Sequence, residues 1–211
     1  MSRRRTDGLK GVLYGFIVAL LLPLLKGLFR LRIEGREHIA PDESYIIVAR
    51  HRSYWDVFIM AAALGASKRI HFIARKGLMR TVAVVQPIIR TFSTVIDREN
   101  FGRADFRKML EAIRRERLVG LFPEGTTRKR VDAKAGAVRF AMMTGKKILP
   151  VNIVARGPYP PDWPFRLPQI TASIGESVTV DELRRGIAGE TSKSELSRLM
   201  SDRLMERVDN A

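Results

Sequence analysis

The sequence predicts an α/β protein in which helices cover the two faces of one β-sheet. Short β-rich runs alternate with segments of helical length, which is the pattern of strands joined by helices. The 211 residues are 45% hydrophobic and 28% charged, which is a globular composition and enough chain to bury a sizeable core. No repeat, low-complexity tract or linker divides the chain. We therefore expect a single domain of the α/β class.

Each expected strand is a short apolar run bounded by polar or turn-forming residues. Strands are predicted at residues 44–49, 69–74, 92–97, 118–122, 147–155 and 169–175. Helices are predicted over residues 57–65, between the second and third strands, over 104–117 and 135–145, and from about Ser192 onward. Gly65 and Gly145 mark two of the helix ends, because glycine is common just past the last turn.

The amino-terminal segment is basic and then apolar. Val12–Leu25 carries no charge, and Lys26, Arg30 and Arg32 follow it. About fourteen apolar residues are fewer than the ~20 that cross a bilayer as a helix, and no signal-peptide cleavage site follows. One interpretation is a buried core helix. The other, which we favour, is a helix half-sunk in the membrane interface, with its flanking cations near anionic headgroups. Pro23 is expected to bend or end this helix.

The charge balance limits the class of partner. There are 38 Lys and Arg residues against 22 Asp and Glu, a formal net charge of +16. Such a field attracts nucleic acid, anionic lipid or phosphorylated substrates. A non-catalytic protein that binds nucleic acid or anionic membrane through this charge is the weaker interpretation, because the basic residues are spread along the chain and no RNA-recognition, zinc-finger or helix-turn-helix signature is present. The absence of cysteine excludes a disulfide framework and a thiolate nucleophile.

His51 and Asp56 lie in a polar break between two apolar runs. Residues five apart diverge by about 140° on a helix, so the two side chains converge only if His51 lies in the loop and Asp56 in the first helical turn. Ser53 followed three residues later by Asp56 resembles a capping box. The same pattern has a purely structural interpretation, in which Asp56 is a first-turn acid favoured by the helix dipole. The two residues alone favour that structural interpretation.

The functional interpretation is a catalytic pair. A neutral imidazole accepts a proton at cellular pH, and a carboxylate on its far nitrogen fixes the tautomer and stabilises the cation. No cysteine and no G-x-S-x-G elbow is available as a nucleophile. His38 and His71 form no metal-ligand spacing with His51. A base without a protein nucleophile points to direct deprotonation of a substrate hydroxyl.

Three loops are expected at the edge where ligands bind in α/β sheets, beyond the carboxyl ends of the strands. They follow Ala49, Ile96 and Phe122. The third contains Gly125, which permits a tight backbone path, and then Thr126, Thr127 and Arg128; hydroxyls, backbone N–H groups and a guanidinium together can hold a phosphate. Arg98 lies at the end of the strand that precedes the second loop. Taken singly, each arginine is equally well explained as a solvated turn residue or an ion-pair partner.

Four blocks carry a resemblance to a known family. In order, the chain contains HRSYWD (51–56), which has the form H-x-x-x-x-D, then VIDR, FPEGTTR and ILPV. Together they resemble the glycerolipid acyltransferases typified by lysophosphatidic acid acyltransferase. The likeness covers most of the chain from about Ile33 onward. It implies a mixed β-sheet of the glycerol-3-phosphate acyltransferase type, with residues 1–30 as a membrane anchor and 31–211 as the catalytic domain.

The resemblance also implies roles by position. His51 would be the general base and Asp56 its orienting partner. Arg98 and Arg128 would hold the phosphate of the acceptor, and Pro150 would help to form the acyl-donor side. The phosphate site would be completed by Glu124, Gly125, Thr126 and Thr127.

The implied reaction transfers an acyl group from acyl-CoA or acyl carrier protein to lysophosphatidic acid, with no cofactor and no metal. The implied partners are an anionic membrane surface, a lysophospholipid and the acyl thioester, and no nucleic acid. The expected location is the cytoplasmic face of the cell membrane, in monotopic or peripheral association. Arg50 stands where the family often has asparagine, and Gly77 where an acidic residue is common. Another lysophospholipid, an amino-acid lipid or a glycolipid is therefore an alternative acceptor.

Overall fold

The computed structural model describes residues 2–80, 86–123, 136–162, 166–187 and 192–211. Within those residues, strands form one sheet in the order β1-β7-β6-β2-β5-β3-β4. The strands are β1 (Arg32–Glu34), β2 (Tyr45–Ala49), β3 (Ile70–Arg75), β4 (Ser93–Ile96), β5 (Leu118–Leu121), β6 (Lys147–Arg156) and β7 (Gln169–Ile174). All neighbouring pairs are parallel except β6 with β7, so the sheet is mixed, as predicted.

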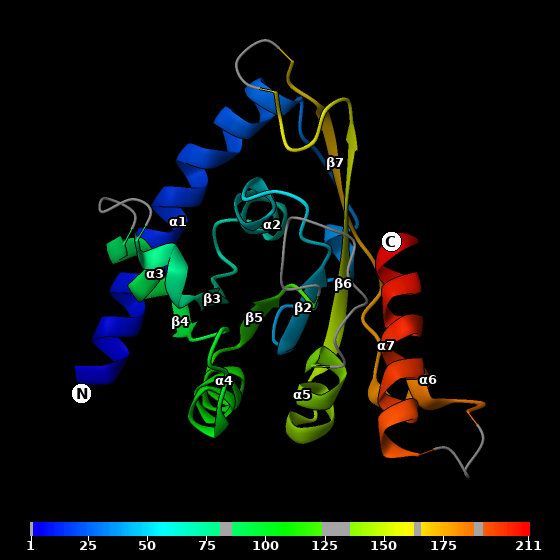
Figure 1. Ribbon diagram of the computed structural model, residues 1–211. Coiled ribbons are helices and arrows are strands. Elements are labelled where there is room, and N and C mark those ends of the chain that lie inside the picture. The colour runs from blue at the N-terminus through cyan, green and yellow to red at the C-terminus, as the bar shows by residue number, and fades with distance from the viewer. Residues whose placement is uncertain (1, 81–85, 124–135, 163–165, 188–191) are drawn as a thin grey trace.

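Helices cover both faces of this sheet (Figure 1). The α-helices are α1 (Ser2–Phe29), α2 (Trp55–Leu64), α3 (Gln86–Phe92), α4 (Arg103–Arg115), α5 (Gly136–Thr144), α6 (Val180–Arg184) and α7 (Lys193–Asp209), and the 3₁₀ helices are η1 (Arg36–His38) and η2 (Lys76–Arg80). Figure 1 shows α1 and α2 on one side of the central strands, and α4, α5 and α7 on the other.

Strand β2 shows why two helical layers are needed. Every residue of β2 is buried, so the strand has no polar face to turn toward water. Tyr45, Ile47 and Ala49 pack with residues of α1 and α2, whereas Ile46 and Val48 pack with residues of α5 and α7. Successive side chains of a strand point to opposite faces, which gives the sheet one hydrophobic core on each side.

The parallel register brings the three predicted loops to one edge. Val48 near the end of β2 pairs with Leu121 at the end of β5, and Arg75 at the end of β3 pairs with Ile96 at the end of β4. The segments that follow β2, β4 and β5 therefore all leave the sheet at its carboxyl edge. This is the edge at which the sequence places the candidate site.

The predicted strands, and the helices after the amino-terminal one that were given bounds, are found with shifts of one or two residues, but β1, α6 and the two 3₁₀ helices were missed. Strand β1 has only three residues, too few to show an alternating pattern. Helix α6 is also short, although it has a full capping box: the Thr179 hydroxyl accepts from Glu182 N–H, and the Glu182 carboxylate accepts from Thr179 N–H. That signal was present in the sequence.

Of the two expectations for Pro23, that it bends or ends the first helix, the second is wrong, because α1 continues through Pro23 to Phe29. Proline removes one helical hydrogen bond, and the following turns are held instead by packing, since Leu25 and Phe29 are fully buried in the core. The fourteen-residue estimate of its apolar length is also too short. Asp7–Phe29 is long and apolar enough to cross a membrane by length and composition, because its few charges lie near its ends. This is consistent with membrane association.

Candidate active site

The structure brings His51 and Asp56 together. His51 lies two residues beyond the end of β2, and Asp56 lies in the first turn of α2. The Nδ1 atom of His51 is 3.2 Å from Oδ2 of Asp56. The imidazole is partly exposed, with 16% of its side chain accessible, while the carboxylate is almost fully buried at 1%. A partly open base beside a buried carboxylate is the arrangement that the functional interpretation needs.

The Asp56 carboxylate is tied to the loop rather than to its own helix. Its Oδ2 atom accepts the backbone N–H groups of Arg52 at 2.6 Å and Ser53 at 2.8 Å. The predicted capping box is therefore only half formed, by the bond from Ser53 N–H to the Asp56 carboxylate. Ser53 Oγ accepts instead from Trp55 N–H at 3.3 Å, and the N-cap of α2 is Tyr54 rather than Ser53. The missing half is the Ser53 side-chain bond to the N–H of Asp56.

These bonds define the tautomer of His51. Because backbone donors already point at Oδ2, the carboxyl group acts as an acceptor, and Nδ1 of His51 must supply the proton of their hydrogen bond. Nε2 is then the ring nitrogen with a lone pair. The geometry gives His51 the tautomer that a general base requires.

Tyr159 completes the surroundings of the carboxylate, and sequence reasoning missed it. Its hydroxyl donates to Oδ1 of Asp56 from the segment between β6 and β7, 103 residues further along the chain. Burial, and next the negative charge of Asp56, raise the pKa of Tyr159, so the phenol stays protonated and remains a donor. The one signal in the sequence is a tyrosine within a proline-rich turn, which by itself indicates only a turn.

Aromatic side chains hold the imidazole ring. His51 stacks on Phe122, with ring centroids 4.3 Å apart and planes 21° apart. Phe122 in turn lies parallel to Phe72, at 6.4 Å. Phe122 is the first residue after β5, so the segment that starts at Glu124 begins two residues from the ring that covers His51. The predicted site residues Glu124, Gly125, Thr126, Thr127 and Arg128 lie outside the described residues.

The turn after β4 positions Arg98. Oδ1 of Asp97 accepts the backbone N–H groups of Glu99 and Asn100, each at 3.1 Å, and Lys76 lies 3.6 Å from its Oδ2. The bond from Asn100 N–H is the main reason that the pKa of Asp97 is below its usual value. Asp97, which sequence reasoning passed over, thus closes the turn that carries Arg98.

A second arginine at this edge, Arg75, was also missed. It is the last residue of β3, and its guanidinium donates to the hydroxyl of Tyr54 at 3.0 Å. Desolvation, followed by the positive charge of Arg75, lowers the pKa of Arg98. Two guanidinium groups within electrostatic reach of each other favour an anion nearby, because it relieves their repulsion. The only sequence signal was a cation at a strand end.

Pro150 lies inside β6, opposite Val48, and is buried. Gly175 N–H donates to its carbonyl at 3.0 Å, and a Cβ added at Gly175 would come within 3.1 Å of its ring. The proline thus fills the seam between β6 and the chain beyond β7. Its part in binding the acyl donor stays a prediction.

Arg50, the residue before His51, is bound to the carboxyl-terminal helix. Its Nε and a terminal nitrogen contact the two carboxylate oxygens of Asp209 at 2.6 and 2.7 Å. Asn152 of β6 also donates to the backbone carbonyl of Asp209, at 2.8 Å. Bidentate pairs of this kind fix orientation as well as distance. The end of α7 therefore holds the loop that presents His51.

Comparison with known proteins identifies the class. A family model described as "Acyltransferase" matches residues 30–154, more than half of the chain, and the chain therefore belongs to this family of enzymes. A 1-acyl-sn-glycerol-3-phosphate acyltransferase of Bacillus subtilis is 25% identical over 165 residues, which cover 78% of this chain and 81% of the relative. The enzyme of the same name from Streptococcus pneumoniae is 28% identical over 145 residues, which cover 68% and 53% of the two chains.

The fold has a solved counterpart. The crystal structure of PlsC, the 1-acyl-sn-glycerophosphate (LPA) acyltransferase of Thermotoga maritima, matches with a TM-score of 0.61. The match covers 100% of this chain and 97% of that one, at 20% sequence identity. It confirms the predicted fold class.

Proposed function

We propose that this acyltransferase moves a fatty acyl group from an acyl thioester to the free hydroxyl of lysophosphatidic acid, giving phosphatidic acid. The observation that carries the proposal is the His51–Asp56 hydrogen bond at the sheet edge where Arg75 and Arg98 also lie. The names of the curated relatives support lysophosphatidic acid as the acceptor. The donor is acyl-CoA or acyl carrier protein, and no further cofactor is proposed.

In the proposed reaction, Nε2 of His51 removes the proton from the acceptor hydroxyl as its oxygen attacks the thioester carbonyl. Asp56 stabilises the imidazolium that forms, because its carboxylate accepts the Nδ1 proton. The tetrahedral intermediate then expels the thiolate, which takes up the proton from His51. No acyl-enzyme is needed, in keeping with a chain without cysteine. Holding both substrates at one sheet edge supplies part of the rate.

The arginines are proposed to bind the phosphate of the acceptor. Arg98 is placed by the turn that Asp97 closes, and Arg75 adds a second positive charge at the neighbouring strand end. In the sequence, Thr126 and Arg128 would add a hydroxyl and a third guanidinium. A phosphomonoester carries up to two negative charges, so clustered cations select it over a neutral headgroup.

Helix α1 is proposed to lie in the membrane interface on the cytoplasmic side, rather than to cross the bilayer. One of its faces is buried against the domain, through Tyr14, Val18, Leu25 and Phe29. The opposite face exposes Leu9, Val12, Leu13, Phe16, Leu20 and Leu24. The helix is also attached near both ends, because Asp7 lies 3.8 Å from Arg69 and the ring of Phe29 packs on Trp55 at 5.0 Å. A helix packed along its domain has one free apolar face, which suits insertion into one leaflet.

The acceptor is tested with purified protein, labelled acyl thioesters and a panel of acceptors. Lysophosphatidic acid is expected to be acylated with the highest kcat/KM. If a headgroup-bearing lysophospholipid, an amino-acid lipid or a glycolipid is acylated faster, that lipid replaces lysophosphatidic acid as the proposed acceptor. Transfer to none of the panel would overturn the proposed function.

The membrane arrangement is tested by thiol labelling, which is simple in a chain without cysteine. Gly8→Cys places a thiol near the start of α1, in open space, and Ser194→Cys places one on the exposed start of α7. In sealed vesicles an impermeant reagent is expected to label both thiols or neither. Labelling of only one would show that α1 crosses the bilayer.

A further inference from the structure

The two oxygens of the Asp56 carboxylate are held in different ways. Oδ2 faces Nδ1 of His51 and two backbone N–H groups. Oδ1 receives the hydroxyl of Tyr159, which comes from a distant part of the chain. The orientation of Asp56 toward His51 therefore depends on donors at both oxygens.

Burial makes the donor at Oδ1 important. Asp56 is 1% exposed, so water cannot readily replace a lost partner, and an unsatisfied oxygen on a buried carboxylate is costly. Tyr159 packs against the core cluster that contains Ala49 and Val151, near the start of the His51 loop. The phenol is thus fixed by packing, and the carboxylate is fixed by the phenol.

We propose that Tyr159 is a positioning residue for acyl transfer, whose hydroxyl fixes Oδ1 of Asp56 so that Oδ2 holds the Nδ1 proton of His51. This inference rests on the proposed function, since it assigns Tyr159 to the same base. The segment after β6 then reaches the base through Tyr159. In this proposal Tyr159 acts through its hydrogen bond to Asp56.

The kinetic test compares two identical substitutions. Tyr159→Phe removes one hydroxyl and is expected to lower kcat about tenfold, while each KM changes by less than about twofold. Tyr45→Phe is the matched control, because Tyr45 also packs in the core and also donates to a carboxylate, that of Glu43, at the other end of β2. It is expected to retain the parental kcat. Equal kcat values for the two variants would overturn the proposal.

A double-mutant cycle separates positioning from a general structural effect. If Tyr159 acts through Asp56, Tyr159→Phe has no further effect on kcat once Asp56→Asn is present. A further tenfold loss in that background would show that Tyr159 acts by another route and would overturn the inference.

The tautomer of His51 gives a readout that does not depend on activity. In protein labelled with ¹⁵N-histidine, neutral His51 is expected to carry its proton on Nδ1 in the parent and to become a mixture of tautomers in Tyr159→Phe. The parent spectrum alone is decisive if the variant fails to fold, since a proton on Nε2 would overturn the arrangement. A parent that transfers no acyl group would overturn the proposed function, and the tautomer measurement would still decide on Tyr159.

Discussion

Two histidines border opposite edges of the same sheet, and their surroundings differ. His51 follows β2 at the carboxyl edge, where its Nδ1 meets a carboxylate and its ring stacks on Phe122. His71 is the second residue of β3, opposite Val119 near the amino edge, and its Nε2 meets the hydroxyl of Thr94 at 2.9 Å. The first ring is partly open to solvent and the second is 8% exposed.

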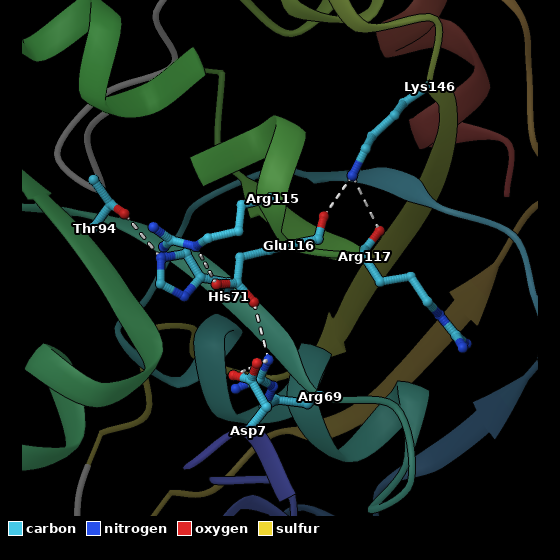
Figure 2. A network of polar contacts seen from close by, with 8 residues as sticks. All are labelled: Asp7, Arg69, His71, Thr94, Arg115, Glu116, Arg117 and Lys146. Carbon is cyan, nitrogen blue, oxygen red and sulfur yellow. Dashed lines mark hydrogen bonds and ion pairs between the residues drawn. The ribbon is translucent and has the colours of Figure 1, made fainter. Parts of the chain in front are cut away.

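Figure 2 shows that the charges near His71 are already paired with one another. Glu116 binds Arg115 and Arg69, each at 3.0 Å, and Arg69 also reaches Asp7 of α1. Lys146 donates to the backbone carbonyls of Glu116 and Arg117. The network joins α1, the start of β3, the connection from α4 to β5 and the connection from α5 to β6. This network connects elements of the fold, whereas at the carboxyl edge the proposed base, His51, is hydrogen-bonded to the carboxylate of Asp56.

Protonation separates the two histidines further. Burial lowers the pKa of His71 to about 4, with the cations Arg115 and Arg69 adding to the shift and Glu116 opposing it. A ring with that pKa is neutral and a poor proton acceptor at neutral pH. The lowered pKa of His71 and its burial therefore favour His51 as the proposed base.

The largest effect is expected from Asp56→Asn. The amide cannot serve as the anionic acceptor for Nδ1, so the imidazolium loses its stabilising charge. We expect kcat to fall by about 10²–10⁴, the range that a positioned base supplies, with a smaller change in either KM. Steady-state kinetics at saturating donor measure this. A kcat within twofold of the parent would show that the Asp56 carboxylate does not assist His51, and the proposed difference between the two sheet edges would be lost.

The next largest effect is on stability: titration of His71 is expected to make the free energy of unfolding depend on pH. Its pKa is about 4 when folded and 6.5 as an unperturbed side chain, so between these values the unfolded chain binds more protons. Stability from this group is complete above pH 6.5 and is lost as pH falls toward 4, by about 3 kcal/mol in all. Denaturant unfolding of the parent and of His71→Gln at several pH values measures this. If the free energy of unfolding depends on pH in the same way in His71→Gln as in the parent, the prediction is contradicted.

Arg98→Gln is expected to raise the KM for the acceptor by about tenfold and to leave the KM for the donor nearly unchanged, because it removes a charge from the proposed phosphate site. Arg107→Gln is the control, since Arg107 is an exposed cation on α4, nine residues further along the chain. Equal increases for both substrates, or the same change in the control, would count against phosphate binding by Arg98.

The smallest effect is expected from Asp209→Asn. This substitution weakens the bidentate pair with Arg50 and loosens the loop that carries His51, so kcat should fall by roughly threefold. Asp202→Asn, at an exposed position of the same helix, provides the control. A kcat that is equal in the two variants would show that the tether does not affect the base.

The sequence predicted what depends on short-range patterns. Strand–helix alternation indicated the α/β class, and the H-x-x-x-x-D block, through its resemblance to a known family, indicated the pairing of His51 with Asp56. Tyr159 and Asp209 reach the same loop from positions 103 and 159 residues away from their partners, and only the folded chain brings them there.

Local rules failed where packing overrides them. Helix α1 passes through Pro23 because buried side chains beyond it hold the next turns. Strand β1 is too short for a pattern, yet its backbone completes the sheet beside β7. Arg75 reads as an ordinary strand residue until the register places it beside the end of β4.

The central claim is that His51, and not His71, is the base. The most direct test measures kcat for His51→Gln and His71→Gln under conditions in which both variants are folded. We expect His51→Gln to lose at least about 10²-fold in kcat and His71→Gln to remain within about threefold of the parent. Parental kcat in His51→Gln would contradict the account.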